Sequence, residues 1–230
     1  MSCGADTARL AATLDAVGHA RLPRLLSEDA CTALIACYDE ERHFRARVVM
    51  ARHGYGQGEY RYFAYPLPDV VAELRARLYP PLARIANEWQ TRLGAPTLYP
   101  GSLDDYLAAC HAAGQRRPTP LLLRYGPGDY NRLHQDVYGP LLFPLQVAVL
   151  LSRPGDHFDG GEFILTEQRA RQQARAEVVP LERGDAVVFP VRERPVASAR
   201  GYARARVRHG VSTIRDGRRF TLGIIFHDAA

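Results

Sequence analysis

The spacing of apolar residues changes along this chain near residue 115. Before this point apolar side chains recur three and four residues apart, as they do along one face of an α-helix. This spacing predicts a helix that is capped by Ser27 and runs through Tyr38. It also predicts a longer helix over 70–93, in which Pro80-Pro81 marks a break or a kink.

A segment rich in glycine and then in tyrosine, 54–68, separates these two helices. Tyr60, Tyr62 and Tyr65 follow one another there at short intervals. Because tyrosine offers a stacking face and a polar tip, the three side chains could form a lip that faces a substrate. The other interpretation is an edge strand whose tyrosines pack on the core.

From residue 120 onward the pattern becomes that of short strands. Runs of β-branched and aromatic residues are divided there by glycine and proline. Many short strands with turn signals predict a sandwich, and the jelly roll is the sandwich that hosts metal sites of the kind described below. We therefore predict a mainly β protein with N-terminal helices (α+β). Its core is a jelly roll, or double-stranded β-helix, over 116–230, and a mainly helical region over 1–115 packs on it. The strands are expected at Leu121–Tyr125, Arg132–Asp136, Phe143–Leu151, Glu162–Leu165, Val178–Val179, Ala186–Phe189, Val207–Ile214 and Arg219–Phe226.

An H-x-D triplet, His134-Gln135-Asp136, ends the stretch that begins at Leu121. On a strand, residues i and i+2 point to the same face, so the imidazole and the carboxylate would converge. Together with one distant histidine they would make the 2-His-1-carboxylate triad of non-haem Fe(II) oxygenases. A second triplet, His157-Phe158-Asp159, is the rival site.

The candidate for the third ligand is His209. Arg204, Arg206 and Arg208 alternate with Ala205, Val207 and His209, so a strand would place the arginines on one face and the histidine on the other. An inward histidine of this kind is either a hydrogen-bonded core residue or a metal ligand. The upstream H-x-D favours the ligand. His227-Asp228 lies beyond the last strand, where a surface position is expected.

Arg219 and Thr221 share one face of the last predicted strand. An arginine fork holds a carboxylate through two hydrogen bonds, and the threonine hydroxyl lies beside it. The inferred ligand is 2-oxoglutarate, bound by its distal carboxylate. The alternative is an ordinary surface arginine, but the neighbouring residues of this strand are apolar, so we expect Arg219 to have a buried partner.

The charge of the chain bears on which class of molecule the protein binds. The chain has 230 residues, a formal charge of +5 and a pI of about 9.2, and all of its Lys+Arg residues are arginine. Residues 166–220 hold thirteen arginines against six acidic residues. This charge indicates either contact with nucleic acid or a bias toward arginine throughout the proteome. For phosphate contact the candidates are Arg169, Arg171, Arg175, Arg192, Arg194, Arg200, Arg204, Arg206 and Arg208.

No membrane partner is expected, because the longest apolar run, 141–151, is too short to span a bilayer. The four cysteines, Cys3, Cys31, Cys37 and Cys110, form no C-x-x-C motif and are expected to be reduced thiols of a cytoplasmic protein.

From Leu121 to its end the chain resembles the Fe(II)/2-oxoglutarate-dependent dioxygenase superfamily. The segment Arg124-Tyr125-Gly126-Pro127-Gly128 through Leu133-His134-Gln135-Asp136 is similar to a stretch of the AlkB-like nucleic-acid dealkylases. The segment 158–163, the turn 183–185 and the ending from His209 to His227 are more similar to prolyl 4-hydroxylases. The combination also resembles a bacterial family of damaged-DNA demethylating oxygenases.

The resemblance implies roles for matched positions only. His134, Asp136 and His209 would bind Fe(II), and Arg219 and Thr221 would bind 2-oxoglutarate. Tyr125 matches a tyrosine that hydrogen-bonds this co-substrate in AlkB-like enzymes. The second arginine that follows the clamp in those enzymes is absent here, which leaves the nucleic-acid substrate open.

The expected function is an Fe(II)- and 2-oxoglutarate-dependent dioxygenase that uses O2 to hydroxylate a substrate C–H, with release of succinate and CO2. Its finer form is oxidative demethylation of alkylated DNA or RNA. A base-directed enzyme needs a residue that stacks on a flipped base, and Tyr60, Tyr62, Tyr138 and Phe158 are candidates. The alternatives are a peptidyl (prolyl-type) or small-molecule hydroxylase and a non-catalytic cupin-like binding module.

Overall fold

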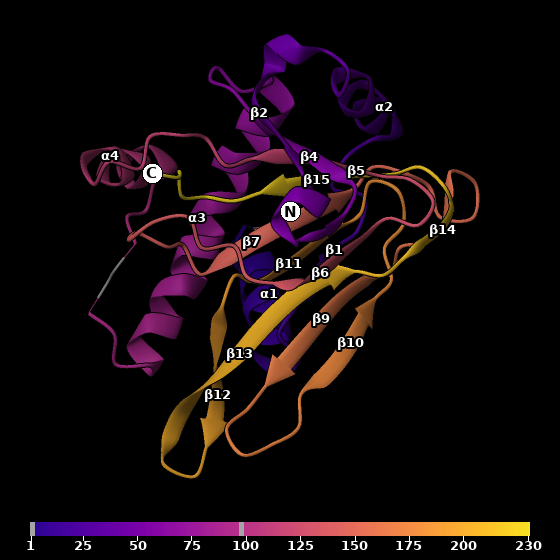
Figure 1. Ribbon diagram of the computed structural model, residues 1–230. Coiled ribbons are helices and arrows are strands. Elements are labelled where there is room, and N and C mark those ends of the chain that lie inside the picture. The colour runs from indigo at the N-terminus through magenta and orange to yellow at the C-terminus, as the bar shows by residue number, and fades with distance from the viewer. Residues whose placement is uncertain (1–2, 97–98) are drawn as a thin grey trace.

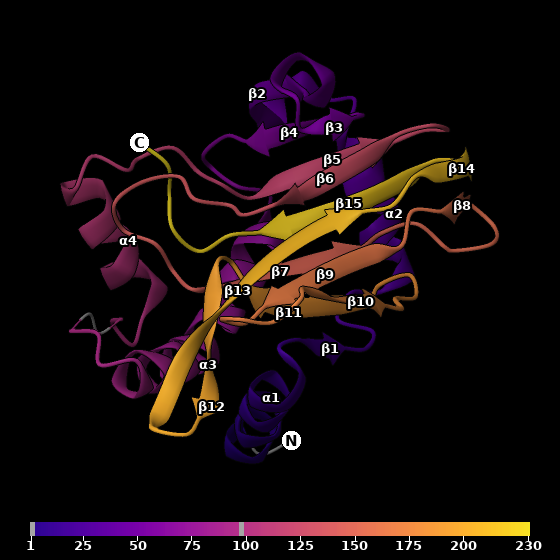
Figure 2. The same ribbon diagram turned by 60° about the horizontal axis from the view of Figure 1, so that its bottom comes forward.

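The computed structural model describes residues 3–96 and 99–230, with side chains from residue 6 onward in the first range. Two antiparallel sheets pack face to face, as expected for the jelly roll (Figures 1 and 2). The seven-stranded sheet has the order β1-β11-β7-β15-β5-β4-β2. These strands are β1 (Ala20–Leu22), β2 (Phe44–Val49), β4 (Glu59–Phe63), β5 (Leu121–Tyr125), β7 (Leu145–Leu150), β11 (Ala186–Pro190) and β15 (Arg219–Ile224).

The second sheet has the order β10-β9-β13-β6-β3, and β12 pairs with β13 beside it. The hairpin of β12 and β13 extends away from the body of the molecule (Figure 1). The strands of this sheet are β3 (Gly56–Gln57), β6 (Tyr130–His134), β9 (Phe163–Gln168), β10 (Arg175–Val179), β12 (Glu193–Ser198) and β13 (Gly201–Val211). A separate pair joins β8 (Phe158–Gly160) to β14 (Ile214–Gly217).

Side chains alternate between the two faces of each strand in the large sheet, so residues of one strand contribute to two separate hydrophobic cores. On β7, Val147 and Val149 pack with the helices, whereas Ala148 and Leu150 face the second sheet. The helices are α1 (Cys3–Val17), α2 (Glu28–Cys37), α3 (Asp69–Arg92) and α4 (Leu103–Ala112), with short 3-10 turns η1 (Glu41–His43) and η2 (Met50–His53). The helices therefore cover one face of the large sheet, and the other face borders the space between the two sheets.

Of the break or kink predicted at Pro80-Pro81, the break is wrong, because the helix α3 is continuous through both prolines. Two prolines inside a helix cost hydrogen bonds and create clashes. The buried residues Leu78, Tyr79 and Leu82 surround the prolines and pack into the helix-side core, and this tertiary packing outweighs the local preference. The predicted cap of α2 is confirmed, because Ser27 accepts a hydrogen bond from the Ala30 backbone N–H.

The first half contains more strand than the sequence pattern predicts. The tyrosine segment forms β4, which lies between β2 and β5 and is not an edge strand. In the second half, β8 and β12 lie outside the predicted strands, and β13 begins at Gly201, earlier than expected. The division at residue 115 stays a prediction; β1 and β4, which precede it, pair with β11 and β5, which follow it.

No helix in the described ranges is long and apolar enough to cross a membrane. Cys31, Cys37 and Cys110 are free thiols, as expected. The side chain of Cys3 lies outside the described residues.

Candidate active site

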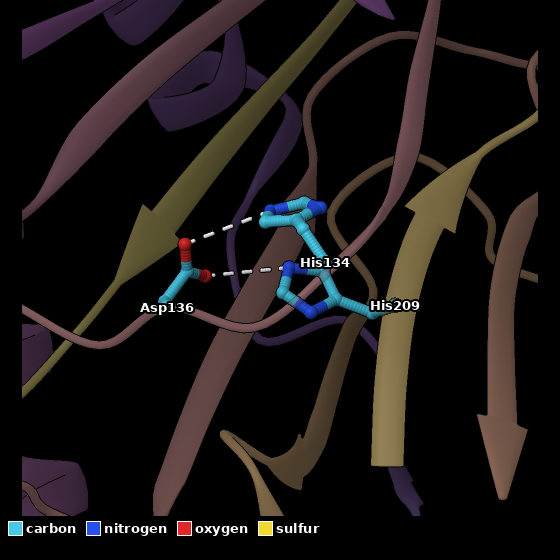
Figure 3. Close-up of side chains that lie close together, drawn as sticks. All are labelled: His134, Asp136 and His209. Carbon is cyan, nitrogen blue, oxygen red and sulfur yellow. Dashed lines mark ion pairs between the residues drawn. The ribbon is translucent and has the colours of Figure 1, made fainter. Parts of the chain in front are cut away.

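Three ligand-type side chains meet between the two sheets. His134 is the last residue of β6, and His209 lies opposite it on β13. The carboxylate of Asp136 faces both rings, with Oδ1 3.6 Å from His134 Nε2 and Oδ2 3.3 Å from His209 Nε2 (Figure 3). The three ligand atoms lie within 4.8 Å of one another.

His134 and Asp136 come together as expected, but not because both lie on one strand. Asp136 lies two residues beyond the end of β6, in the loop that follows. The Gln135 side chain, between the two ligands, donates to the backbone oxygens of Arg192 (2.9 Å) and Val207 (2.8 Å). This pair of hydrogen bonds fixes the loop along β13 and turns the Asp136 carboxylate toward the histidines.

The surroundings of the three groups orient them and set their ionisation. The Arg132 carbonyl lies 2.7 Å from His134 Nδ1, which therefore carries a hydrogen, while Nε2 faces Asp136. Burial lowers the pKa of His209, and the neighbouring His134 acts in the same direction. Burial opposes ionisation of Asp136, but the hydrogen bonds from His209 and Tyr138 favour the carboxylate, and the pKa of this carboxyl lies well below its usual range.

A cavity of about 360 Å³ contains these three residues. Its wall is apolar and aromatic for the most part, with a few polar groups. The other predicted site residues, Tyr60, Tyr62, Tyr125, Tyr138, Arg219 and Thr221, all line this cavity. The structure thus brings residues from β4, β5, β6, β13 and β15 to one space.

Arg219 is buried in this cavity wall with an exposed fraction of 2%. Its Nη1 donates to Thr221 Oγ1 at 2.6 Å, and its guanidinium lies 5.7 Å from the ring centre of Tyr125 and 5.8 Å from that of Phe158. Among the described residues no carboxylate forms an ion pair with it, and its Nε has no hydrogen-bond partner. Burial lowers the pKa of Arg219 to about 10, so the group stays cationic at neutral pH. The expected buried partner is therefore not a protein carboxylate.

Three tyrosines form a series that ends at Asp136. Tyr138 donates to Asp136 Oδ1 at 2.6 Å. The ring of Tyr62 lies edge-to-face against those of Tyr138 and Tyr60, with ring centres 6.1 and 5.3 Å apart. Tyr138 thus orients Asp136, in addition to lining the cavity. Tyr65 lies elsewhere and bonds to Asp228 and Arg75.

Sequence reasoning missed two cavity residues. Gln146 is 2% exposed on β7, and its Nε2 has no hydrogen-bond partner among the described residues. The signal was present, since Gln146 interrupts an otherwise apolar run. Tyr55 lines the cavity and is 50% exposed, and its position between Gly54 and Gly56 was the available signal.

The rival triplet does not converge on one point. Asp159 forms two hydrogen bonds with Arg215, at 2.8 and 2.9 Å, and His157 Nδ1 accepts from the Arg153 backbone at 3.1 Å. Phe158 packs in the core near Arg219 and does not line the cavity.

Two expectations about exposure are wrong. His227 and Asp228 are fully buried, not on the surface, because the chain after β15 turns inward and Asp228 binds Arg75. Arg194 cannot contact phosphate as expected, because it is 2% exposed and pairs with Glu167. Arg204, Arg206 and Arg208 are exposed on the outer face of β13, opposite His209, as the alternation predicts.

Comparisons with known proteins assign the family. The model of the Oxygenase-NA family, described as "Oxygenase, catalysing oxidative methylation of damaged DNA", matches residues 58–229. The chain belongs to this oxygenase family. The uncharacterized protein Rv2227 of Mycobacterium tuberculosis (strain ATCC 25618 / H37Rv) is 52% identical over 168 residues, which cover 73% of this chain and 72% of that protein.

Solved structures share the fold of this Oxygenase-NA chain. A Pseudomonas putida prolyl-4-hydroxylase has a TM-score of 0.54 and 17% identity, and the match covers 97% of this chain and 100% of that one. An oxidoreductase of the 2OG-Fe(II) oxygenase family from Burkholderia pseudomallei has a TM-score of 0.56 and 19% identity, with coverage of 97% and 93%.

The chain is therefore an oxygenase, an oxidoreductase, and it shares its fold with solved 2OG-Fe(II) oxygenases. The cavity fits Fe(II) and 2-oxoglutarate. Two imidazoles and a carboxylate on one side are the donor set of non-haem Fe(II) sites, which leave further positions open. The buried and uncompensated Arg219 suits a dicarboxylate in the same cavity.

Proposed function

We propose that this oxygenase removes alkyl groups from nucleic-acid bases by oxidising the C–H bonds of the alkyl carbon. His134, Asp136 and His209 would hold Fe(II), and Arg219 would hold the distal carboxylate of 2-oxoglutarate. The observation that carries the assignment of these residues is that one cavity contains both a convergent His-Asp-His group and a buried arginine without a carboxylate partner.

Each group in the cavity has a task in this proposal. Held by His134, Asp136 and His209, Fe(II) would supply the oxidising chemistry that couples O2 to the conversion of 2-oxoglutarate to succinate and CO2. Arg219 and Thr221 would fix the distal carboxylate, and the ring centre of Tyr125 lies 5.7 Å from the Arg219 guanidinium. Burial raises the pKa of Tyr125 to about 12, so its hydroxyl is a hydrogen-bond donor at neutral pH. Tyr138 keeps Asp136 turned toward the histidines.

The reaction on the substrate balances as follows. An N–CH3 group takes up one oxygen atom of O2 and becomes N–CH2OH, while the other oxygen atom enters succinate. The N–CH2OH group then releases formaldehyde and leaves N–H. The apolar wall formed by Leu121, Leu123 and Ile225 excludes water around the alkyl group.

Two observations support a nucleic-acid substrate. The family model that matches three quarters of the chain is described by its action on damaged DNA. The cavity wall carries Tyr60 and Tyr62, which offer rings to a base that has been turned out of its stack. Exposed arginines on the outer face of β13 add positive charge, although Arg204 is paired with Glu193.

The experiment that tests this function measures succinate formation from 2-oxoglutarate in the presence of Fe(II) and air. Wild type is compared with His134→Ala and with His157→Ala, each with and without N-methylated single-stranded DNA. His157 is the matched control, because it is a histidine of the second H-x-D triplet whose ring has another partner.

We expect activity in wild type and His157→Ala, no activity in His134→Ala, and formaldehyde release when methylated DNA is present. Full activity of His134→Ala would refute the metal assignment. Succinate formation that methylated DNA or RNA does not stimulate would refute the nucleic-acid substrate and turn attention to peptide and small-molecule substrates.

A further inference from the structure

Exposed apolar side chains gather around the mouth of the cavity. Of the seven exposed large hydrophobic residues in the described chain, two line this cavity, namely Tyr55 and Val137, which are 50% and 47% exposed. Exposed apolar groups that cluster beside a cavity indicate a surface that binds another molecule.

Tyr55 is held in a fixed position relative to the metal ligands. Its backbone N–H donates to Met50 at 3.1 Å, and its carbonyl accepts from the Arg132 N–H at 2.9 Å. Its ring stacks on His53, with centres 5.3 Å apart and planes 21° from parallel. Because β6 carries both Arg132 and His134, Tyr55 is tied directly to the strand that presents a metal ligand.

The glycine after Tyr55 makes this attachment possible. Gly56 has φ of +141°, and a Cβ at that position would lie 2.3 Å from the Tyr130 carbonyl oxygen. Only glycine allows β3 to approach β6 this closely. The aromatic group at the mouth is therefore presented by a tight and specific backbone arrangement, not by a loose loop.

The charge around Tyr55 is positive. Arg132 is exposed, packs over the ring of Tyr130 at 5.9 Å, and forms no ion pair with any described residue. Arg52 and His53 are exposed on the turn η2 that precedes Tyr55. The nearby Asp129 carboxylate is turned inward and accepts from the Gly126 N–H at 2.8 Å. The mouth thus combines an exposed aromatic ring with two exposed arginines, Arg52 and Arg132, that form no ion pair with any described residue.

We propose that this rim, defined as His53, Tyr55, Arg132 and Val137, binds single-stranded nucleic acid next to the base that is oxidised. Tyr55 stacks on a neighbouring base, Val137 covers its edge, and Arg132 binds a backbone phosphate. The inference rests on the proposed function and adds the form of the substrate. An exposed ring can stack only on a base whose face is free, so an unpaired strand is preferred to a duplex.

The test measures binding and does not depend on turnover. Fluorescence anisotropy follows a labelled 12-nucleotide single strand with one N-methylated base, and the same strand annealed to its complement. The protein is loaded with Fe(II) and 2-oxoglutarate without O2. The variants are Tyr55→Ala and Tyr55→Phe, with Tyr202→Ala as the control, because Tyr202 is exposed to the same degree (47%) on the β12–β13 hairpin.

We expect Tyr55→Ala to weaken single-strand binding by about 5-fold to 100-fold. Tyr55→Phe, which keeps the stacking ring and also reports on folding, should retain affinity, and Tyr202→Ala should bind as wild type does. Arg132→Gln should lower the slope of log affinity against log salt by about one phosphate contact, whereas Arg77→Gln, an exposed arginine of α3, should not.

Two results separate this inference from the proposed function. If wild type binds the single strand and Tyr55→Ala binds it equally well, or if wild type binds the duplex as tightly, the assignment of the rim is overturned and the function stands. If wild type binds neither strand nor duplex while it converts 2-oxoglutarate with a peptide, the nucleic-acid function fails together with the rim.

Discussion

Three arginines among the described residues are almost completely buried, namely Arg75, Arg194 and Arg219. The surroundings of Arg75 and Arg219 differ. Arg75, on α3, is 1% exposed and donates to the carbonyls of Ile225 and Phe226, to the Tyr65 hydroxyl and to the Asp228 carboxylate, at 2.8 to 3.0 Å. Arg219, on β15, is 2% exposed and donates to the Thr221 hydroxyl alone among the described side chains.

The difference separates a structural charge from a binding charge. A buried cation is costly unless it is paired and hydrogen-bonded. Arg75 meets this condition within the protein and joins the chain end to the helix layer. Arg219 does not meet it, and a ligand carboxylate in the adjoining cavity would complete its coordination. A buried arginine whose hydrogen-bond and charge partners are all in the protein has a structural role. A buried arginine that lacks such partners and lies beside a cavity indicates a bound ligand.

The largest expected effect is on stability, at Arg75. Arg75→Met would leave the Asp228 carboxylate buried without its cation, and the free energy of unfolding should fall by roughly 3 to 5 kcal/mol. Urea denaturation followed by circular dichroism measures this. The double variant Arg75→Met, Asp228→Asn should recover part of the loss, because neither charge remains. An unchanged midpoint in the single variant would contradict a structural role.

At Arg219 the same substitution should act on ligand binding and not on folding. Arg219→Met should weaken 2-oxoglutarate binding by roughly 100-fold, since the carboxylate loses a buried cation. Its stability should equal or exceed that of wild type, because an uncompensated charge is removed. Calorimetric titration of the Mn(II)-loaded protein measures the affinity, with Arg218→Met, an exposed neighbour, as the control. Unchanged affinity would remove Arg219 from the site.

The sequence allowed one of these two arginines to be interpreted and not the other. Arg219 stands in a strand whose neighbours are apolar, so burial and a need for a partner follow from local pattern. Arg75 reads as one of several polar residues on a helix. Its partner Asp228 is 153 residues away, and no local pattern brings the two together. The same limit explains why His227 and Asp228 were expected on the surface.

Other parts of the fold also separate into those that local sequence predicts and those that depend on distant contacts. The strand β5, which has a clear apolar run, was predicted to the residue, and β7, β11 and β15 were predicted to within two residues at each end. The metal candidates followed from the H-x-D spacing and the alternation around His209. The strand β12, ERPVAS, has charge and proline where β-branched residues would be expected, and only its pairing with β13 makes it a strand. The orientation of Asp136 depends on the Gln135 contacts beyond β6, which spacing alone does not reveal.

Carboxylates allow the same comparison, and the first of them is the partly exposed Asp136. Tyr138→Phe removes the hydroxyl that holds Asp136 Oδ1 and should weaken Fe(II) or Mn(II) binding by about 10-fold to 100-fold, as is typical when the partner of a metal ligand is lost. Metal titration under anaerobic conditions measures the affinity. Tyr62→Phe, which removes only the next hydroxyl of the series, should have a smaller effect. Equal metal affinity in wild type and Tyr138→Phe would show that Tyr138 contacts substrate only.

The smallest expected effect is at Asp185, a buried carboxylate whose partners are all provided by the protein. Arg21 donates to it at 2.7 Å and the Arg24 backbone N–H at 2.9 Å. Burial opposes its ionisation, but these hydrogen bonds prevail and lower the pKa of Asp185. A lowered pKa in the folded state means that the carboxylate stabilises the fold above the unfolded value near 3.8 and that this stability is lost as the pH falls below it.

Asp185→Asn should therefore lower the free energy of unfolding by about 1 kcal/mol at pH 7. The gap between wild type and variant should narrow as the pH falls below about 4. Thermal unfolding at a series of pH values measures both, and 2-oxoglutarate affinity at pH 7 should not change. If the difference in unfolding free energy between wild type and Asp185→Asn stays constant down to pH 3, Asp185 acts through its shape and not its charge. If Asp185→Asn loses 2-oxoglutarate binding, a carboxylate whose partners all lie in the protein also affects the site, and the comparison fails.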